Sequence, residues 1–196
     1  CMPSGIKWVK DAVVAVDPVM NQVTTQSNGK IPYDFLVLTP GLQINWNKVE
    51  GITRETLGQG DAHCIYDFEG AQKTWKGIQA FAQKGGRGIY TDTYTKHKCG
   101  GAPKKICLLT EHYARKQGTR DKLTFDYYTA SKQLYDVPYY TPRLEEIYQE
   151  RHIPIHLNTR VKGIDTAAKK VYMDQIETRG EEKIVTPLVE DYDFLH

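Results

Sequence analysis

The chain has 196 residues, of which 40% are hydrophobic and 26% charged, and its formal net charge is +2 at pH 7. This composition excludes a disordered chain, and no run approaches the roughly 20 apolar residues that a membrane-spanning helix needs. The lysines and arginines are scattered, which argues against nucleic acid as a partner, and the 4 cysteines are too few and too irregularly spaced for a disulfide-stapled scaffold.

The first 41 residues predict short strands separated by turns. Alternating apolar residues predict strands at residues 6–9, 12–16 and 22–25, with turn signals at Asp17-Pro18 and Ser27-Asn28-Gly29. An apolar run then covers residues 33–38 and is closed by Thr39-Pro40-Gly41, which is typical of a buried parallel strand that ends in a loop. Residues 42–66 show little periodicity and are interpreted as a connector.

Strands and helices alternate in the rest of the chain. Apolar residues at helical spacing predict a helix that begins near Phe68 and ends at Gly85-Gly86, a second helix at residues 102–116, and a third helix that Thr141 caps, with Pro142 in its first turn. Strands are predicted at residues 87–91, 122–127 and 153–157, and a second meander at residues 161–164, 171–173 and 184–185.

The order β-α-β-α-β predicts an α/β fold with a Rossmann-like, doubly wound parallel sheet, here joined to a β-meander. Residues 1–60 are interpreted as the tail of one dinucleotide-binding domain, containing the meander and the buried strand. Residues 61–190 are interpreted as a second Rossmann-like domain of the NAD-binding type, and residues 191–196 as the start of a return to the first domain. Because the apolar run at residues 192–196 resembles an interrupted strand, we expect the chain to be the central fragment of a longer protein.

The turn after the first strand of the second domain is the most informative segment. A nucleotide-binding sheet carries Gly-x-Gly-x-x-Gly at this turn, so that backbone amides can approach a pyrophosphate. Here residues 93–105 form a longer turn with large side chains, which disfavours binding of NAD in the usual way.

The same turn places a thiol just ahead of a helix. Free amides and the positive end of the helix dipole near Ala102 favour an anion at Cys99. Cationic side chains are expected to add to this effect, and those nearest in sequence are Lys96, Lys98 and Lys104, with His97. This combination favours an ionised, nucleophilic Cys99; an inert cysteine in a basic loop is the alternative.

The segment Lys98-Cys99-Gly100-Gly101-Ala102-Pro103-Lys104-Lys105 resembles the K-C-A-G-A-P-x-K segment of sulfide:quinone oxidoreductases, particularly the mitochondrial-like branch, within the FAD-dependent pyridine nucleotide-disulfide oxidoreductase superfamily. The resemblance extends over essentially the whole chain. It includes the segments at residues 3–8, 33–36, 41–43, 73–75, 148–151 and 192–196.

The resemblance implies an enzyme that oxidises sulfide at a pair of redox cysteines and passes electrons through FAD to a membrane quinone. Cys99 matches the first cysteine of the pair, and the second lies beyond His196 in the family, so this chain alone is expected to be inactive. Val13 matches a position that faces the adenine of FAD, and Thr39, Pro40 and Gly41 match a loop that passes close to the cofactor. Tight FAD binding by this piece is not expected, because the Gly-x-Gly-x-x-Gly fingerprint for FAD is absent.

The family's partners are sulfide, quinone and a membrane surface that is contacted by a C-terminal part. The resemblance therefore implies a peripheral protein on the cytoplasmic face of a bacterial membrane or on the mitochondrial inner membrane, with a homo-oligomer left open.

The other cysteines and histidines have weaker assignments. Cys64 has a possible redox role, because some branches of the family have a third cysteine that attaches to or borders the flavin; a connector thiol is the alternative. Cys107 lies inside the second helix, where burial is expected. His63-Cys64 and His97-x-Cys99 lack the spacing of zinc ligands, so no metal site is predicted. His97 is interpreted as a solvent-exposed residue, with a proton relay as the alternative.

Two other classes of function remain open at this point. One is a related flavoprotein, either a sulfide dehydrogenase or a type II NADH:quinone dehydrogenase, although the latter would need a glycine-rich turn at residues 93–104. The other is a non-catalytic Rossmann-like domain that serves as an interaction platform.

Overall fold

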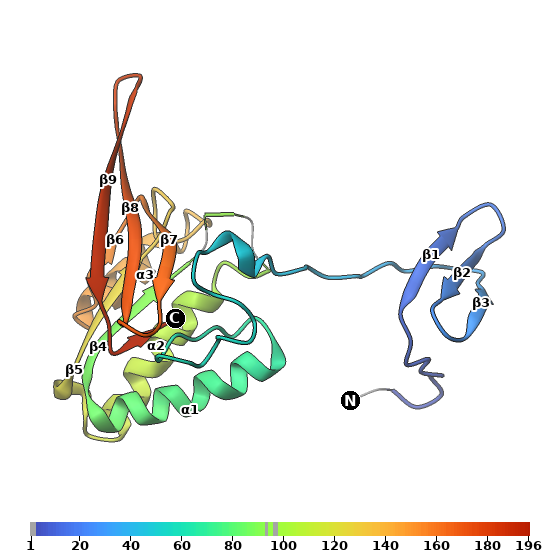
Figure 1. Ribbon diagram of the computed structural model, residues 1–196, viewed down its shortest axis with the longest axis horizontal. Helices are drawn as coiled ribbons and strands as arrows, with labels where there is room; N and C mark the ends of the chain where they lie inside the picture. The colour runs from blue at the N-terminus through green and yellow to red at the C-terminus, as the bar shows by residue number, and fades with distance from the viewer. Residues whose placement is uncertain (1–2, 93, 96–97) are drawn as a thin grey trace. The chain divides into compact units, whose positions relative to one another are not determined.

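The computed structural model describes residues 3–92, 94–95 and 98–196, which form two compact units, Cys1–Gly41 and Leu42–His196 (Figure 1). The first unit is a three-stranded antiparallel sheet in the order β1-β2-β3. Its strands are β1 (Val13–Asp17), β2 (Gln22–Thr25) and β3 (Gly29–Pro32). The predicted meander is therefore present, and the Ser27-Asn28-Gly29 turn connects β2 to β3.

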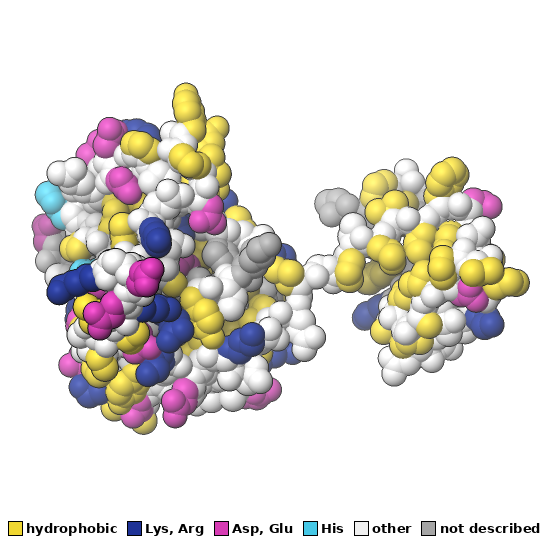
Figure 2. All heavy atoms as spheres, turned by 90° about the horizontal axis from the view of Figure 1, so that it is seen from above, with side chains coloured by type: hydrophobic (Ala, Val, Ile, Leu, Met, Phe, Trp, Pro, Cys, Tyr) yellow, Lys and Arg dark blue, Asp and Glu magenta, His cyan; other side chains and the backbone are white. Residues whose placement is uncertain are grey.

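Two strands predicted for the first unit are absent from the structure. Residues 6–9 and 33–38 pair with no strand, and Phe35 is 94% exposed. A parallel strand needs at least one parallel neighbour to pair its backbone groups, and the strands of this unit are those of the small antiparallel meander. Figure 2 shows hydrophobic side chains over much of the visible surface of this unit, and the exposed ones include Val14, Val19 and Val37.

The second unit is built on a parallel sheet in the order β10-β4-β5-β6. Its strands are β4 (Gly86–Thr91), β5 (Leu123–Tyr128), β6 (Ile155–His156) and β10 (Phe194–Leu195). The helices are α1 (Phe68–Lys84), α2 (Ala102–Lys116) and α3 (Thr141–Glu150), with short 3-10 turns η1 (Trp46–Lys48) and η2 (Arg120–Lys122). The predicted α/β class and the alternation of strands and helices are confirmed.

A second, antiparallel sheet in the order β7-β8-β9 completes this unit. Its strands are β7 (Thr159–Asp165), β8 (Lys170–Arg179) and β9 (Glu182–Asp191). Figure 1 shows that the long β8–β9 hairpin extends away from the body of the unit. These strands form the second meander that the sequence predicted.

The parallel sheet is buried on both faces, because its side chains alternate between two cores. Tyr90 and Phe194 pack with residues of the three helices, whereas Ile89 and Leu195 pack with residues of β7, β8 and the connector. A doubly wound sheet has helices on both faces, and here the antiparallel sheet covers one of them. All four of these side chains are at most 2% exposed, so the parallel sheet is a rigid platform for the loops at its edge.

The ends of the helices follow from local chemistry. The Asp67 side chain accepts a hydrogen bond from the Gly70 N–H at the start of α1, and Gly85, with φ at +84°, ends the helix where glycine is favoured. Thr141 is the first residue of α3 and not its cap. Its hydroxyl donates backward to the carbonyls of Tyr135 and Val137 instead of accepting from the helix.

The last six residues lie within the second unit. Phe194 and Leu195 pair in parallel with Gly88 and Ile89 of β4. In this position they extend the parallel sheet, whereas their assignment as the start of a return to the first domain stays a prediction. Phe194 packs in the core on the helical side of the parallel sheet, and Leu195 packs in the core on the other side. The compact units also divide after Gly41, because residues 42–66 pack onto the second unit through Ile52, Leu57 and Ala62.

A buried carboxylate ties the helices together. Glu111 has a fully buried side chain that forms ion pairs with Arg115, Arg120 and Arg151. We expect Glu111→Gln to lower the free energy of unfolding by about 2 kcal/mol, because three guanidinium groups lose their buried negative partner and two of them, those of Arg120 and Arg151, are themselves partly buried. Urea unfolding measures this change. Glu146→Gln is the matched control, since its exposed ion pair should contribute less than about 0.5 kcal/mol; equal effects of the two substitutions would contradict the prediction.

Candidate functional site

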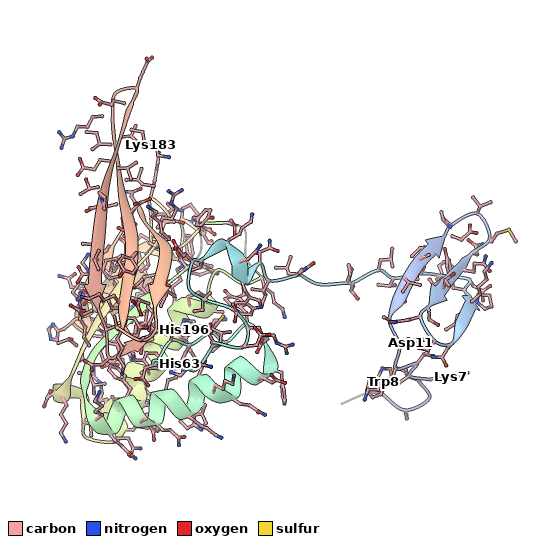
Figure 3. The ribbon with its side chains drawn as sticks, in the orientation of Figure 1. Lys7, Trp8, Asp11, His63, Lys183 and His196 are labelled. Atoms are coloured by element: carbon pink, nitrogen blue, oxygen red, sulfur yellow. The ribbon has the colours of Figure 1, made fainter. Side chains whose placement is uncertain are left out.

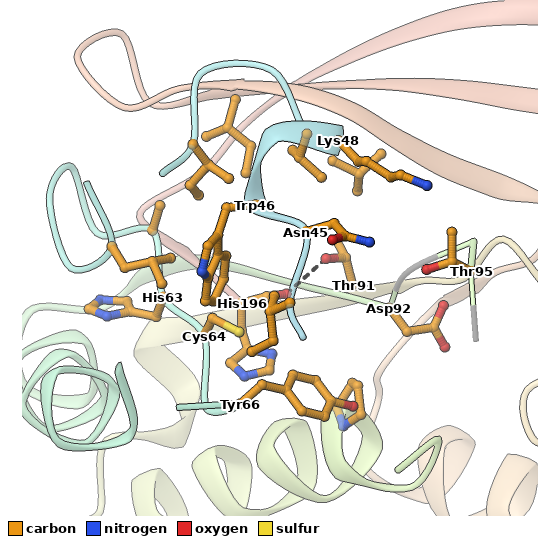
Figure 4. Close-up of a pocket in the computed structure, with 18 of the residues that line it drawn as sticks. Asn45, Trp46, Lys48, His63, Cys64, Tyr66, Thr91, Asp92, Thr95 and His196 are labelled. Atoms are coloured by element: carbon orange, nitrogen blue, oxygen red, sulfur yellow. Dashed lines mark hydrogen bonds between the residues drawn. The ribbon is translucent and has the colours of Figure 1, made fainter. Parts of the chain in front are cut away.

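A cavity of about 270 Å³ opens in the second unit at the carboxyl ends of β4 and β10 (Figure 4). Thr91, the last residue of β4, and His196, which follows β10, both line it, and the backbone N–H of Thr91 donates to the His196 carbonyl at 2.7 Å. The connector, the turn after β4, and β7 supply the other walls. Ligands of open α/β sheets bind at this edge, so the position itself marks a candidate site.

The walls of the cavity are mainly apolar and aromatic. Trp46 of η1 is prominent in Figure 4, and Tyr66 lies below it. The other apolar side chains in the lining include Ile52, Leu57, Val161, Ile164 and Leu195. Lys48 and Lys98 also line the cavity, and both side chains are exposed. The cavity therefore combines an apolar interior with cationic groups that can meet solvent.

Cys99 lies in the turn that leads from the cavity to α2. Its side chain is exposed, and the preceding residue, Lys98, lines the cavity. The Cys99 carbonyl accepts hydrogen bonds from the Ala102 N–H at 3.1 Å and from the Tyr66 hydroxyl at 2.8 Å. The structure thus places this sulfur in the open, just ahead of the N-terminus of a 15-residue helix.

The lysines predicted to stabilise a thiolate have different environments. Lys98 is exposed and lines the cavity, as a cation near Cys99 should. Lys104 is buried, and its ammonium forms an ion pair with Asp92 at 2.5 Å and lies over the Tyr127 ring. Because Asp92 balances its charge, Lys104 does not act as the free cation that the sequence suggested. Lys96 and His97 lie outside the described residues.

The other cysteines lie in apolar surroundings. Cys64 lines the cavity, and burial raises the pKa of its thiol to about 11, although the Tyr66 backbone N–H donates a hydrogen bond to the sulfur and partly offsets this rise. Cys107 is fully buried in the core among the helices, and burial raises its thiol pKa well above the ordinary value. At neutral pH both therefore remain protonated, unlike a nucleophilic cysteine.

Two buried histidines lie at the cavity: sequence reasoning considered His63 only as a zinc ligand and did not consider His196 at all. His63 and His196 are each 8% exposed, line the cavity, and have ring nitrogens without a hydrogen-bond partner (Figures 3 and 4). Burial lowers the pKa of His63 to about 4, while burial and repulsion from His63 lower that of His196 to about 3. Both rings are therefore neutral at pH 7. The only signal in the sequence was the position of His196 directly after an apolar strand.

Among the described residues, no group of three or more His, Cys, Asp or Glu side chains is arranged to hold a metal ion. The ring of His63 stacks on Phe194 at 4.8 Å between centroids, which gives this histidine a packing role.

The residues predicted to contact FAD lie in the first unit. Val13 is 55% exposed on β1, and Thr39, Pro40 and Gly41 are exposed in the segment that ends this unit. Gly41 has φ at +77°, and a side chain added there would meet nothing within 4 Å. These four positions are exposed to solvent, and their contact with FAD stays a prediction.

The fold is that of a known class of enzymes. A sulfide:quinone oxidoreductase from Aquifex aeolicus superposes with a TM-score of 0.71 at 24% identity, over 95% of this chain and 41% of that one. NDH2 from Plasmodium falciparum, solved in complex with NADH, superposes with a TM-score of 0.65 at 13% identity, over 95% of this chain and 39% of that one. The chain thus shares the α/β fold of these oxidoreductases, and at these identities the likeness concerns the fold alone.

Sequence comparison identifies the relatives more closely. The chain is 36% identical over 152 residues to the mitochondrial sulfide:quinone oxidoreductase of Dictyostelium discoideum, and 30% identical over 195 residues to that of Mus musculus. These matches cover 78% and 100% of this chain. No protein-family profile matches it. The resemblance seen in the sequence is confirmed, and the chain is a relative of the sulfide:quinone oxidoreductases.

The chain spans 33% of the Dictyostelium protein and 42% of the mouse protein. Within the part that the structure describes, no helix is both long and apolar enough to cross a membrane.

Proposed function

We propose that this chain is the cysteine-bearing segment of a sulfide:quinone oxidoreductase, and that Cys99 is the thiol that accepts sulfur from sulfide. The observation that carries the proposal is the exposed thiol of Cys99 in the turn before α2, directly after a residue that lines the cavity. The relatives' names supply the substrate class, sulfide, and the electron acceptor, quinone.

The reaction joins two sulfur atoms. The Cys99 thiolate and hydrosulfide form one S–S bond and yield a persulfide, with the loss of two electrons; the proton of hydrosulfide remains on the terminal sulfur. A quinone that takes up these two electrons and two protons becomes a quinol. FAD, when bound, supplies the redox chemistry that connects the two halves.

The electrostatics of the cavity suit an anionic substrate. Lys48 and Lys98 carry the positive charges in the lining, and the Asp92 carboxylate is paired with Lys104. His63 and His196 are neutral at pH 7 because burial lowers their pKa values. An approaching hydrosulfide therefore meets exposed lysines at an otherwise apolar cavity, which favours its entry over that of a cation.

The turn after β4 favours this function over an NADH dehydrogenase. Tyr94, Thr95 and Lys98 occupy the position where a glycine-rich turn would expose backbone amides to a pyrophosphate, and all of them line the cavity. We propose that Val13, Thr39, Pro40 and Gly41 contact FAD in the full-length protein. Cys64, which lines the cavity as a protonated thiol, is proposed as a secondary redox group.

The quinone, a membrane surface and self-association complete the proposal. A quinone acceptor implies a peripheral membrane protein, on the cytoplasmic face of a bacterial membrane or on the mitochondrial inner membrane. The mitochondrial names of both relatives support the second location. Contact with the membrane through parts outside this chain, and a homo-oligomer, remain proposals that follow from the family.

The reactivity of the thiols tests the role of Cys99. We expect iodoacetamide at pH 7 to alkylate Cys99 faster than free cysteine and at least about 100-fold faster than Cys64, because a pKa of about 11 leaves Cys64 almost without thiolate. Peptide mass spectrometry of the native chain follows each site separately. Cys107 is the buried control and should react only after unfolding. Alkylation of Cys99 more slowly than free cysteine would argue against a nucleophilic role.

A further inference from the structure

Tyr66 connects the two cysteine-bearing segments beside the cavity. Its hydroxyl donates to the Cys99 carbonyl at 2.8 Å, across 33 residues of sequence. Its backbone N–H donates to the sulfur of Cys64, and its ring lines the cavity (Figure 4). One residue therefore contacts both segments, and no feature of the sequence had singled it out.

The surroundings of the Tyr66 hydroxyl keep it a hydrogen-bond donor. Burial raises the pKa of the phenol well above its ordinary value, and the Asp92 carboxylate raises it further. The hydroxyl thus stays protonated over the whole working range of pH.

The turn that carries Cys99 is held at a second point. The guanidinium of Arg160 on β7 lies over the Tyr94 ring at 5.4 Å from its centroid, and it also pairs with Asp174 at 2.9 Å. Tyr94 fixes the start of the turn against the antiparallel sheet, while Tyr66 fixes the residue that bears the thiol. The Tyr66 hydroxyl is the side-chain group that acts directly on the Cys99 peptide group, whose carbonyl also accepts from the Ala102 N–H at 3.1 Å.

We propose that Tyr66 is the positioning residue of Cys99, and that its hydroxyl holds the thiol of Cys99 at the N-terminus of α2 beside the cavity. The geometry stands on its own, whereas its meaning for catalysis rests on the proposed function. A helix N-terminus stabilises a thiolate only within the first turn, because the field of the free amides falls off over that distance. Without the Tyr66 hydroxyl, the Ala102 N–H remains as the donor to the Cys99 carbonyl, so the peptide group would be held less firmly and the thiol would spend less time ahead of α2.

The test compares Tyr66→Phe with native protein, using the pH profile of Cys99 alkylation by iodoacetamide in the folded chain. We expect the rate at pH 7 to fall about threefold and the profile to move to higher pH, with the melting temperature unchanged within about 2 °C. Tyr139→Phe is the matched control, since Tyr139 is 85% exposed and should leave the profile unchanged. Tyr66→Leu removes the ring as well and reports on packing.

An unchanged alkylation profile in Tyr66→Phe would overturn the proposal. If the profile changed in Tyr66→Leu alone, the ring and not the hydroxyl would be responsible, and the proposal would also be overturned. Amide hydrogen exchange at residues 98–102 is the second measurement, and faster exchange in Tyr66→Phe is expected. These readouts need neither sulfide nor quinone. A Cys99 that Tyr66 positions but that proves dispensable for turnover would refute the proposed function and leave the positioning role intact.

Discussion

Replacing Cys99 with serine in the flavin-loaded full-length protein is expected to lower sulfide-dependent quinone reduction at least about 10³-fold. The thiol is the proposed site of S–S bond formation, and a serine hydroxyl cannot form the persulfide. Removing the group that forms the covalent intermediate has effects of this size or larger in other enzymes. The measurement is steady-state reduction of a soluble quinone by sulfide.

The loss must be distinguished from damage to the fold or to cofactor binding. Cys99 is exposed, so the substitution should leave the melting temperature and the visible absorption of the flavin unchanged. Cys107→Ala serves as a control of the opposite kind: Cys107 is fully buried, so its removal should cost about 1 kcal/mol of stability and leave turnover intact. Turnover within twofold of native in Cys99→Ser would remove this residue from the mechanism.

The elements of the second unit could be predicted because their patterns are local. The apolar residues of α1 recur at helical spacing, and the helix ends at Gly85 as expected. The helix predicted at residues 102–116 has the same bounds as α2. Cys99 could be identified because an open glycine turn, a thiol and a helix start occur consecutively in the chain, so their proximity required no knowledge of the tertiary fold.

The missed features depend on contacts between distant segments. The charge of Lys104 is balanced by Asp92, 12 residues earlier, and sequence alone shows only a lysine near a thiol. The apolar run that includes Phe35 was predicted to be buried but is exposed. The prediction failed because a local apolar pattern does not show which strands, if any, cover it. Tyr66 and His196 reach the cavity from the connector and from the end of β10, and neither stands in a recognisable motif.

The second unit is expected to lose about 4 kcal/mol of stability between pH 7.5 and pH 5. His63 and His196 have pKa values lowered to about 4 and about 3 in the folded chain, by burial in both cases. Since an unfolded histidine titrates near pH 6.5, the unfolded state binds more protons below that pH. The stability is therefore complete above pH 6.5 and is lost as the pH falls toward the folded values, by about 2 kcal/mol per histidine at pH 5.

Urea unfolding at each pH measures the loss of stability. Hydrogen exchange at the amides of β4 and β5 shows that the loss belongs to the second unit. His63→Phe should remove about half of it, because phenylalanine keeps the stacking on Phe194 and has no ring nitrogen to protonate. His112→Gln, at an exposed position on α2, is the control and should leave the pH dependence unchanged. Carboxylates contribute little above pH 5, since their unfolded pKa values lie lower. Equal stability at pH 7.5 and pH 5 would contradict the prediction. It would mean that both rings take up protons in the folded chain, although the apolar walls of the cavity disfavour charged imidazoles.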